Sequence, residues 1–247
     1  MTRAGTDDAL LGGQLMLRQP AAGARAGSDA VLLAAAVPAK GNQHVLELGC
    51  GTGAAMLCLA RRVVGVSVTG IELEAKAVEF ARLNIERNGL ATRAAVILGD
   101  IAAPPRSVTG ASFDHVMANP PFFAAGRASP APDASRRMAR LAAPDALEIW
   151  MRAAARMVKP RGSVTVICRT ERLDDLIAAC RRRFGGIVLF PLWPGGGKPA
   201  KRFILQARAG SGAALRLVPG LVLHGGGSTY TEAAQRVLRG GEALTLL

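Results

Sequence analysis

Short apolar runs of strand length alternate with longer amphipathic stretches through the first half of the chain. The alternation predicts strands at residues 44–48, 66–71, 94–98 and 113–118, with helices at 54–62 and 74–88. Strands that alternate with helices are typical of an α/β fold, in which the helices cover both faces of a parallel sheet. We therefore predict a doubly wound, mostly parallel sheet.

The segment before residue 44 adds an N-terminal extension. An alternating run at 14–19 suits an edge strand or one arm of a hairpin. Ser28 or Asp29 is predicted to cap an apolar helix that starts at Ala30 and that Pro38 stops. The alternative role of Ser28 and Asp29 is to line a site that opens at this helix N-terminus.

The same alternation of elements resumes after residue 143. It predicts helices at 144–157, 172–183 and 231–239, strands at 162–168, 186–190 and 203–209, and an apolar run at 215–223. A hairpin connection between the last two strands predicts an antiparallel edge on the sheet. We expect a single domain over 1–247, with an extension at 1–40, a core at 41–210 and a tail at 211–247.

A glycine-rich turn joins the first strand to its helix. Gly49, Gly51 and Gly53 allow the backbone to approach a ligand closely, and the helix that follows presents free N–H groups. Glu72 ends the second strand, about 20 positions after the glycines, where an acid binds ribose hydroxyls. This pattern fits dinucleotides and S-adenosylmethionine equally well. Glu47 favours S-adenosylmethionine, because an acid suits its cationic methionine end and repels a pyrophosphate.

The fourth strand ends in a rigid turn, Asn119-Pro120-Pro121-Phe122. Two prolines prevent both a continued strand and an immediate helix, so the turn can aim the Asn119 amide. An amide oxygen and a nearby backbone carbonyl could accept both hydrogens of an exocyclic amine while the Phe122 ring stacks on its base. The alternative is a simple strand exit with a core phenylalanine.

Strand ends of a parallel sheet meet at one edge. Gly49, Glu72, Asp100 and Asn119 should therefore converge on one crevice. Asp100 suits an adenine amine and equally suits a cap on its own turn. This convergence is the central prediction from the sequence.

The charge balance favours a nucleic-acid partner. The formal net charge is +13 and the sequence pI is near 11.0. The alternative is the Arg-rich, Ala-rich composition of a GC-rich genome, with these residues on an ordinary solvated surface. The candidate RNA-binding residues lie in a lid-like segment at 123–143 and a basic loop near 194–202, and they are Phe123, Arg136, Arg137, Lys198, Lys201 and Arg202.

Several other classes of protein are disfavoured. No uninterrupted apolar run of about 18 residues exists, and Asp7 and Asp8 stand where a signal peptide would be basic and then apolar, so we expect a cytoplasmic protein. The four cysteines and three histidines are scattered without ligand spacing, so we expect neither a metal site nor a disulfide framework. The sequence leaves the oligomeric state open.

The motifs together resemble a known family. Residues 45–53 with Glu72 and 119–122 look like the class I, Rossmann-like methyltransferases that modify amino groups. Residues 25–33 and 228–233 are similar to the bacterial tRNA adenine-N6 methyltransferases that act next to the anticodon of a valine tRNA, at adenine-37. The resemblance implies an S-adenosylmethionine cofactor, a seven-stranded sheet with a reversed last strand, and a flipped adenine.

This resemblance suggests a mechanism and leaves three alternatives. The Asn119 oxygen and the Pro120 carbonyl would hold the adenine amine, and Phe122, with Phe123, would stack on the base. The same turn occurs in methyltransferases of guanine N2 in rRNA and of a glutamine amide in proteins. The third alternative is an inactive cofactor fold that binds RNA.

Overall fold

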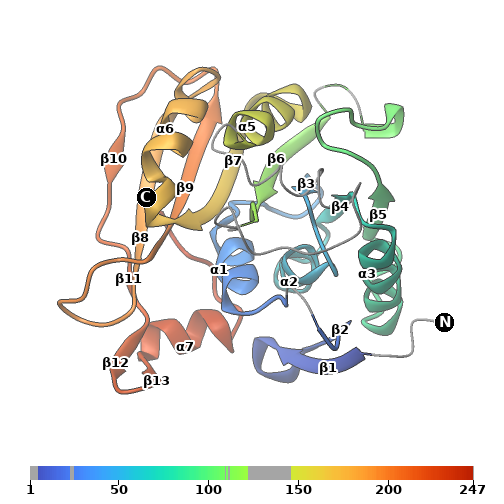
Figure 1. Cartoon of the computed structure of the whole chain (residues 1–247), viewed down its shortest axis with the longest axis horizontal. Coiled ribbons are helices and arrows are strands. Elements are labelled where there is room, and N and C mark those ends of the chain that lie inside the picture. Colours follow the sequence, from blue (N-terminus) through green and yellow to red (C-terminus); the bar gives the residue numbers. More distant parts are fainter. Residues whose placement is uncertain (1–4, 23–24, 109, 111, 122–145, 247) are drawn as a thin grey trace.

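The computed structural model describes residues 5–22, 25–108, 110, 112–121 and 146–246. At its centre is a mixed sheet with the order β10-β8-β9-β7-β6-β3-β4-β5, and β11 also pairs with β8 (Figure 1). The strands are β3 (His44–Leu48), β4 (Ser67–Glu72), β5 (Ala94–Leu98), β6 (Phe113–Ala118), β7 (Val158–Arg169), β8 (Phe184–Trp193), β9 (Arg202–Ala209), β10 (Arg216–Leu217) and β11 (Leu221–Val222). This is the α/β class that the sequence predicts.

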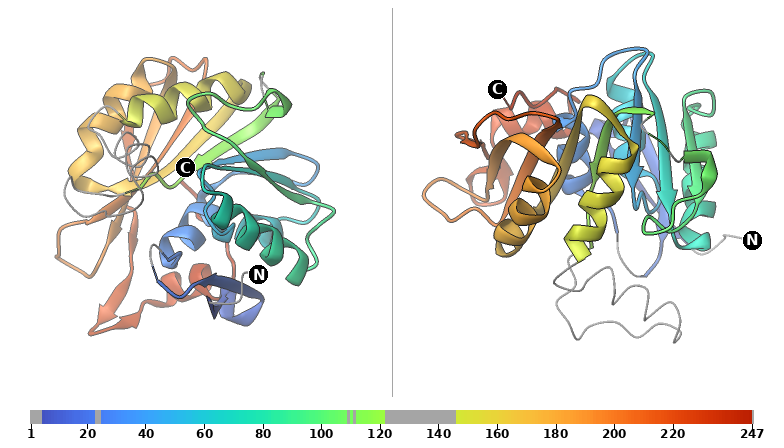
Figure 2. Two further views of the ribbon diagram at one scale, coloured as in Figure 1. Left: turned by 45° about the vertical axis from the view of Figure 1, so that its right-hand side comes forward. Right: turned by 90° about the horizontal axis from the view of Figure 1, so that it is seen from above.

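Helices cover both faces of the sheet (Figure 2). One face carries α1 (Ser28–Ala36), α2 (Ala54–Arg62) and α3 (Ala75–Arg87), and the other carries α5 (Ala146–Met157) and α6 (Leu173–Arg181). Strand β3 contributes side chains to the cores on both faces, because successive side chains of a strand point to opposite sides. Its Val45 packs in the cluster of α1 and α2, whereas its Leu46 and Leu48 pack in the cluster of α5. Glu47 therefore faces α2.

Two details of the sheet differ from the prediction. The antiparallel strand β9 lies between β7 and β8 and pairs antiparallel with both, so it is an interior strand and not an edge. The reason is burial, since every residue from Phe203 to Ala207 is buried. Over the described residues the sheet has nine strands where seven were expected, because two short segments of the tail, β10 and β11, pair in parallel with β8.

The start of α1 also differs from the prediction. Gly27 holds the N-cap position without a side-chain hydrogen bond, and Ser28 is the first helical residue. Asp29 does not cap the helix and pairs instead with Arg202, with 2.7 Å between Oδ2 and Nε. Of the two roles that the sequence left open for Asp29, a helix cap and the lining of a site, the structure excludes the cap.

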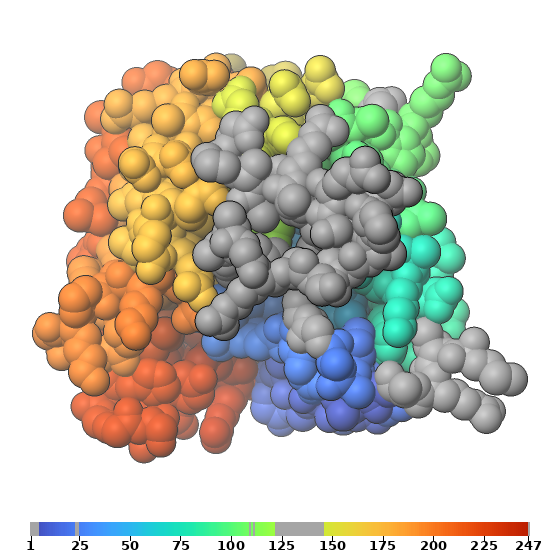
Figure 3. Space-filling view, viewed as in Figure 1, coloured from blue at the N-terminus to red at the C-terminus, as the bar shows by residue number. Residues whose placement is uncertain are grey.

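Both ends of the chain pack against the helix layer of the first face. The N-terminal hairpin, β1 (Gly5–Leu10) and β2 (Leu15–Pro20), lies against α3, and the arm predicted at 14–19 is β2. The C-terminal segment contains a small hairpin, β12 (His224–Gly226) and β13 (Thr229–Tyr230), followed by α7 (Glu232–Leu238). Helix α7 reaches both α1 and the turn of the N-terminal hairpin. The blue and red segments consequently lie side by side at the lower edge of the space-filling view (Figure 3).

The cysteines are structural in character. All four are buried and free, and burial raises the pKa of the Cys58 and Cys180 thiols to about 12. The described residues hold no group of three or more His, Cys, Asp or Glu side chains that could bind a metal ion. In the same part of the chain, no helix combines the length and apolar character needed to cross a membrane.

Candidate active site

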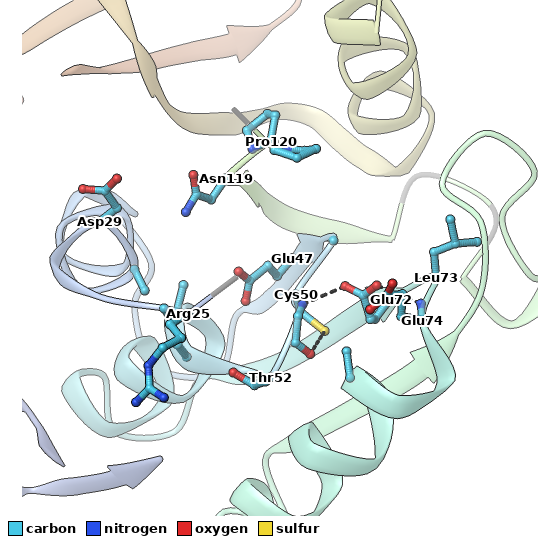
Figure 4. A pocket seen from close by; sticks show the side chains of 18 of the residues that line it. Arg25, Asp29, Glu47, Cys50, Thr52, Glu72, Leu73, Glu74, Asn119 and Pro120 are labelled. Carbon is cyan, nitrogen blue, oxygen red and sulfur yellow. Dashed lines mark hydrogen bonds between the residues drawn. The ribbon is translucent and has the colours of Figure 1, made fainter. Parts of the chain in front are cut away.

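A cavity of about 840 Å³ opens at the carboxyl ends of β3, β4 and β6 (Figure 4). The structure brings most of the predicted site residues to its wall: Ser28, Asp29, Glu47, Gly49, Gly51, Glu72, Asp100, Asn119, Pro120, Pro121 and Arg202. Gly53 is not part of this wall, and Lys198 and Lys201 are exposed in the loop between β8 and β9, outside it. Phe122, Phe123, Arg136 and Arg137 lie outside the described residues.

The glycine turn is packed on one side and open on the other. Gly49 has φ of +62°, and a Cβ there would lie 2.5 Å from Cη2 of Trp150. Gly51 has φ of +54°, and no atom lies within 4 Å of the Cβ position. The indole of Trp150 therefore supports the turn at Gly49, while Gly51 leaves room for a ligand to approach the backbone.

Glu72 is fixed at the end of β4 by two backbone donors. Its Oε2 accepts from the N–H of Gly51 at 2.8 Å, and its Oε1 accepts from the N–H of Glu74 at 2.9 Å. A carboxylate has about four acceptor positions, so each oxygen still has room for a further donor. The side chain is thus oriented and available to bind hydroxyl groups.

Glu47 is a buried carboxyl group on the same wall. It is 3% exposed, and its Oε2 accepts from the N–H of Met56, in the first turn of α2, at 2.8 Å. Burial raises the pKa of Glu47 well above its usual value, although the Met56 hydrogen bond lowers it, and the charge of Glu72 raises it further. The carboxylate form of Glu47 is therefore costly in this protein unless a cation joins it.

Asn119 presents an unused acceptor. The residue is half-buried at the end of β6, and its side-chain oxygen is shielded from solvent without a hydrogen-bond partner. A buried polar group left unpaired costs about 1–3 kcal/mol, so an unpaired group on a cavity wall points to a ligand. Figure 4 shows the Asn119 amide and the Glu47 carboxyl directed toward the same side of the cavity.

Arginines form part of the rim. Arg169 and Arg202 face each other across the β7–β9 pair, and both line the cavity together with Arg25. Asp29 pairs with Arg202, yet burial raises the pKa of Asp29 above its usual value because the loss of solvent outweighs the neighbouring charge. Arg25 is likewise paired, with Asp8, so the rim combines arginines with neighbouring carboxylates.

Asp100 carries out the capping role that the sequence allowed. Its Oδ1 accepts from the N–H of Ala102 at 2.8 Å, and its carbonyl accepts from the N–H of Ala103. It also lines the cavity, so the capping bond holds the side chain in place beside a bound ligand. The two roles are compatible in this geometry.

Comparison with known proteins identifies the chain. The sequence profile of the family described as methyltransferase small domain matches residues 24–172. The chain belongs to the methyltransferase small-domain family. The match includes the glycine turn, Glu72, Asp100 and Asn119, and it ends before Arg202.

Two named relatives and a solved structure are also methyltransferases by name. A tRNA1(Val) (adenine(37)-N6)-methyltransferase of Porphyromonas gingivalis is 35% identical over 70% of this chain and 61% of its own length. A protein of the same name from Tolumonas auensis is 30% identical over 67% of this chain and 68% of its own length. A predicted O-methyltransferase from Agrobacterium tumefaciens superposes with a TM-score of 0.74 at 27% identity, covering 88% of this chain and 98% of that chain.

Sequence reasoning missed several residues of this methyltransferase-family site. Trp150, Arg25 and Arg169 line the cavity. No short motif marks Trp150 or Arg169, and Arg25 was noted only as part of the stretch 25–33, without a role in the site. Trp150 could have been found as a large aromatic residue in the helix that follows the NPPF turn. Asn84 lies behind the glycine turn, fully buried, and a buried asparagine in an amphipathic helix has no sequence signature.

Proposed function

We propose that the protein transfers a methyl group from S-adenosylmethionine to the N6 amine of an adenine in tRNA. The observation that carries the proposal is the unpartnered oxygen of Asn119, which lies on the same cavity wall as the glycine turn, Glu47 and Glu72. An acceptor without a donor, close to a nucleoside-binding loop, suits a substrate that brings an amine. The relatives named as tRNA adenine-N6 methyltransferases make adenine the first candidate.

The cavity suits the proposed cofactor. Glu72 would accept hydrogen bonds from the ribose hydroxyls, Asp100 from the adenine amine, and the open backbone at Gly51 would lie against the nucleoside. Glu47 would meet the positively charged methionine end, which offsets the cost of its buried charge. When bound, S-adenosylmethionine would supply a methyl group activated by a sulfonium, so that an amine nitrogen can bond to the methyl carbon while the sulfur leaves with the electron pair as a thioether.

The protein's own contribution is to orient the amine. Adenine N6 is a poor nucleophile because its lone pair is delocalised into the ring. The Asn119 oxygen and the Pro120 carbonyl would accept the two amine hydrogens and leave the lone pair directed at the methyl group. Alignment of two reactants of this kind accounts for about 7 kcal/mol or more of barrier lowering in well-oriented systems. No strong base is needed, because the amine becomes acidic only as the methyl transfers, and the proton that N6 then loses can pass to water.

The rim of the cavity suits a polyanionic substrate. Arg25, Arg169 and Arg202 border it, and the chain has a net charge of +13. A base must leave its stack to reach a cavity of this kind, and phosphate contacts at the rim would hold the nucleotides beside it. RNA is therefore the favoured substrate class over a protein amide.

One experiment separates the candidates. The protein is incubated with methyl-labelled S-adenosylmethionine and, separately, with unmodified total tRNA, total rRNA and a protein lysate. The nucleic acids are then digested to nucleosides. We expect label in N6-methyladenosine from tRNA. Label in N2-methylguanosine, in protein or on a hydroxyl group would assign a different acceptor, and binding of RNA without transfer would identify an inactive module.

A further inference from the structure

Two asparagines, Asn84 in α3 and Asn88 at its C-cap, hold the N-terminal hairpin. Asn84 accepts from the N–H of Arg18 at 2.7 Å and donates to the Arg18 carbonyl at 3.0 Å. Asn88, one helical turn later, accepts from the N–H of Met16 at 3.0 Å and donates to the Met16 carbonyl at 2.8 Å. The two side-chain amides thus bond the backbone N–H and C=O groups of alternate residues in β2, as a neighbouring strand would.

Of these two asparagines, only Asn84 also bonds a residue that lines the cavity. Its Nδ2 donates a second hydrogen bond, of 3.0 Å, to the carbonyl of Thr52 in the glycine turn. Asn84 is 0% exposed, and its three bonds use both amide hydrogens and the oxygen. One side chain therefore ties the backbone of the hairpin to the backbone of the glycine turn.

A second link runs from the hairpin to the opposite wall. Gln19 is 1% exposed, accepts from the N–H of Ala26 at 2.7 Å and donates to the Ala26 carbonyl at 3.2 Å. It also donates to Oδ2 of Asp8 at 2.8 Å, and Asp8 in turn pairs with Arg25. The segment that lines the cavity before α1 is consequently anchored to both strands of the hairpin.

We propose that the N-terminal hairpin is part of the cofactor site, with Asn84 as a positioning residue that sets the geometry of the glycine turn. This inference rests on the proposed function, and it concerns residues 5–20, which precede the segment matched by the family profile. Of the hairpin residues, Pro20 alone is among those that line the cavity, so most of the hairpin's effect passes through Asn84 and Gln19. Because linked equilibria are reciprocal, cofactor binding also tightens the docking of the hairpin.

The matched pair of asparagines gives the test. Asn84→Ala removes both the hairpin bonds and the Thr52 bond. Asn88→Ala removes the hairpin bonds and the bond of 2.7 Å from Asn88 Nδ2 to the backbone carbonyl of Asn84, and it leaves the Thr52 bond in place. Affinity for S-adenosylhomocysteine is measured by calorimetry. We expect the dissociation constant of Asn84→Ala to rise about tenfold, equal to about 1.4 kcal/mol, and that of Asn88→Ala to stay within about twofold of the wild type. Turnover of Asn84→Ala at saturating cofactor should approach that of the wild type.

A measurement on the wild-type protein does not depend on how well the variants fold. Amide exchange of Arg18, whose N–H is held by Asn84, should slow severalfold when S-adenosylhomocysteine is added. Equal affinities of the two variants for S-adenosylhomocysteine would overturn the inference. So would an amide exchange rate of Arg18 that is the same with and without the ligand. Failure of the wild-type protein to bind the ligand at all would overturn the proposed function itself.

Discussion

Asn119 and Glu47 lie at or near the ends of adjacent strands, and each places a polar group with incomplete stabilisation in the cavity wall. The Asn119 oxygen is buried without a donor, and the Glu47 carboxyl is buried with one backbone donor. Both conditions are unfavourable in the free protein, and a bound amine and a bound cation would relieve them. Active sites characteristically keep such groups at some cost to stability.

Asn119 is expected to act in transfer and not in cofactor binding. Asn119→Ala should lower kcat about a hundredfold or more, because the amine loses its orientation, and should leave the affinity for S-adenosylmethionine nearly unchanged. Single-turnover kinetics and calorimetry measure the two quantities. A large loss of cofactor affinity would place Asn119 in the wrong role.

Glu72 is expected to show the reverse behaviour. Glu72→Ala removes the acceptor proposed for the ribose and also releases the N–H of Gly51, so the dissociation constant for S-adenosylmethionine should rise by at least about tenfold. Glu72→Gln keeps the shape and one acceptor oxygen and serves as the matched control. An unchanged dissociation constant in Glu72→Ala would remove this residue from the cofactor site.

Glu47 gives a prediction about pH. Its folded-state pKa lies above the usual 4.5, so the unfolded chain releases the proton first and stability falls as pH rises from about 4.5 to the folded-state pKa. Glu47→Gln keeps an acceptor for the N–H of Met56 and has no titrating group at this position. Its stability therefore does not fall through this effect as pH rises. Its stability relative to wild type should therefore increase by about 1.4 kcal/mol per pH unit in that window.

Urea unfolding at several pH values between 4.5 and 8 measures this difference. The contribution of Asp7, Asp114 and Glu148, whose pKa values are lowered by hydrogen bonds and nearby cations, runs in the opposite direction and cancels between the two proteins. A stability difference that is constant with pH would show that Glu47 is charged at all these pH values. The variant should also bind S-adenosylmethionine more weakly than the wild type at neutral pH.

At this scale the sequence predicts residue types better than their partners. Strand ends identify Glu72, Asp100 and Asn119, because each follows directly from the alternation of elements. A helix cap was one of the two roles open to Asp29, because caps are local, and the partner that the structure shows, Arg202, is 173 residues away in sequence. Contacts of that range are set by the fold and leave no trace in local spacing.

At the scale of elements, the glycine turn and α5 depend on one another. Trp150 is 2% exposed, and its ring occupies the space that a side chain at position 49 would need. Glycine at position 49 is therefore required by packing as well as by the backbone conformation. The turn acquires its shape partly from a helix that follows it by about a hundred residues.

Substitution of the two glycines should separate these effects. Gly49→Ala combines a positive φ with a contact of 2.5 Å to Trp150 and should destabilise the protein by about 3 kcal/mol. Gly51→Ala has a similar φ with open space around it and should cost only about 1–2 kcal/mol. Urea unfolding measures both changes.

The double variant tests the packing explanation. Phenylalanine lacks the outer part of the indole ring, so Gly49→Ala combined with Trp150→Phe should lose less stability than the sum of the two single variants. Strict additivity would mean that the Trp150 contact does not limit position 49.

Local patterns predict elements well and their neighbours less well. The helix predicted at 54–62 is α2 over the same residues, because a glycine turn begins it and a β-branched run ends it. Strand β9 was placed at an edge because a hairpin links it to β8, and a hairpin does not say which side of the pair faces the rest of the sheet. The buried run from Phe203 to Ala207 was the signal for an interior position.

At the scale of the whole molecule, charge dominates the expected interaction with RNA. The dissociation constant for tRNA should rise steeply between about 50 and 200 mM salt, because each phosphate contact releases a counterion. Arg202→Gln should weaken binding and reduce the slope of log affinity against log salt by about one. Filter binding across a salt series measures both. Binding of S-adenosylhomocysteine serves as the control and should change little, and a flat tRNA curve would contradict the role of the basic rim.

The pairing of β10 and β11 with β8 affects how β8 is protected during translation. Strand β8 has an almost continuous buried run, and without its partners from the tail it would offer free backbone groups along one side. The later of these partners, β11, ends at residue 222, so both are available to β8 only after synthesis has passed that residue. Until then a second nascent chain on the same message could pair with the open side, so a slow or interrupted end to translation favours aggregates over correctly folded protein.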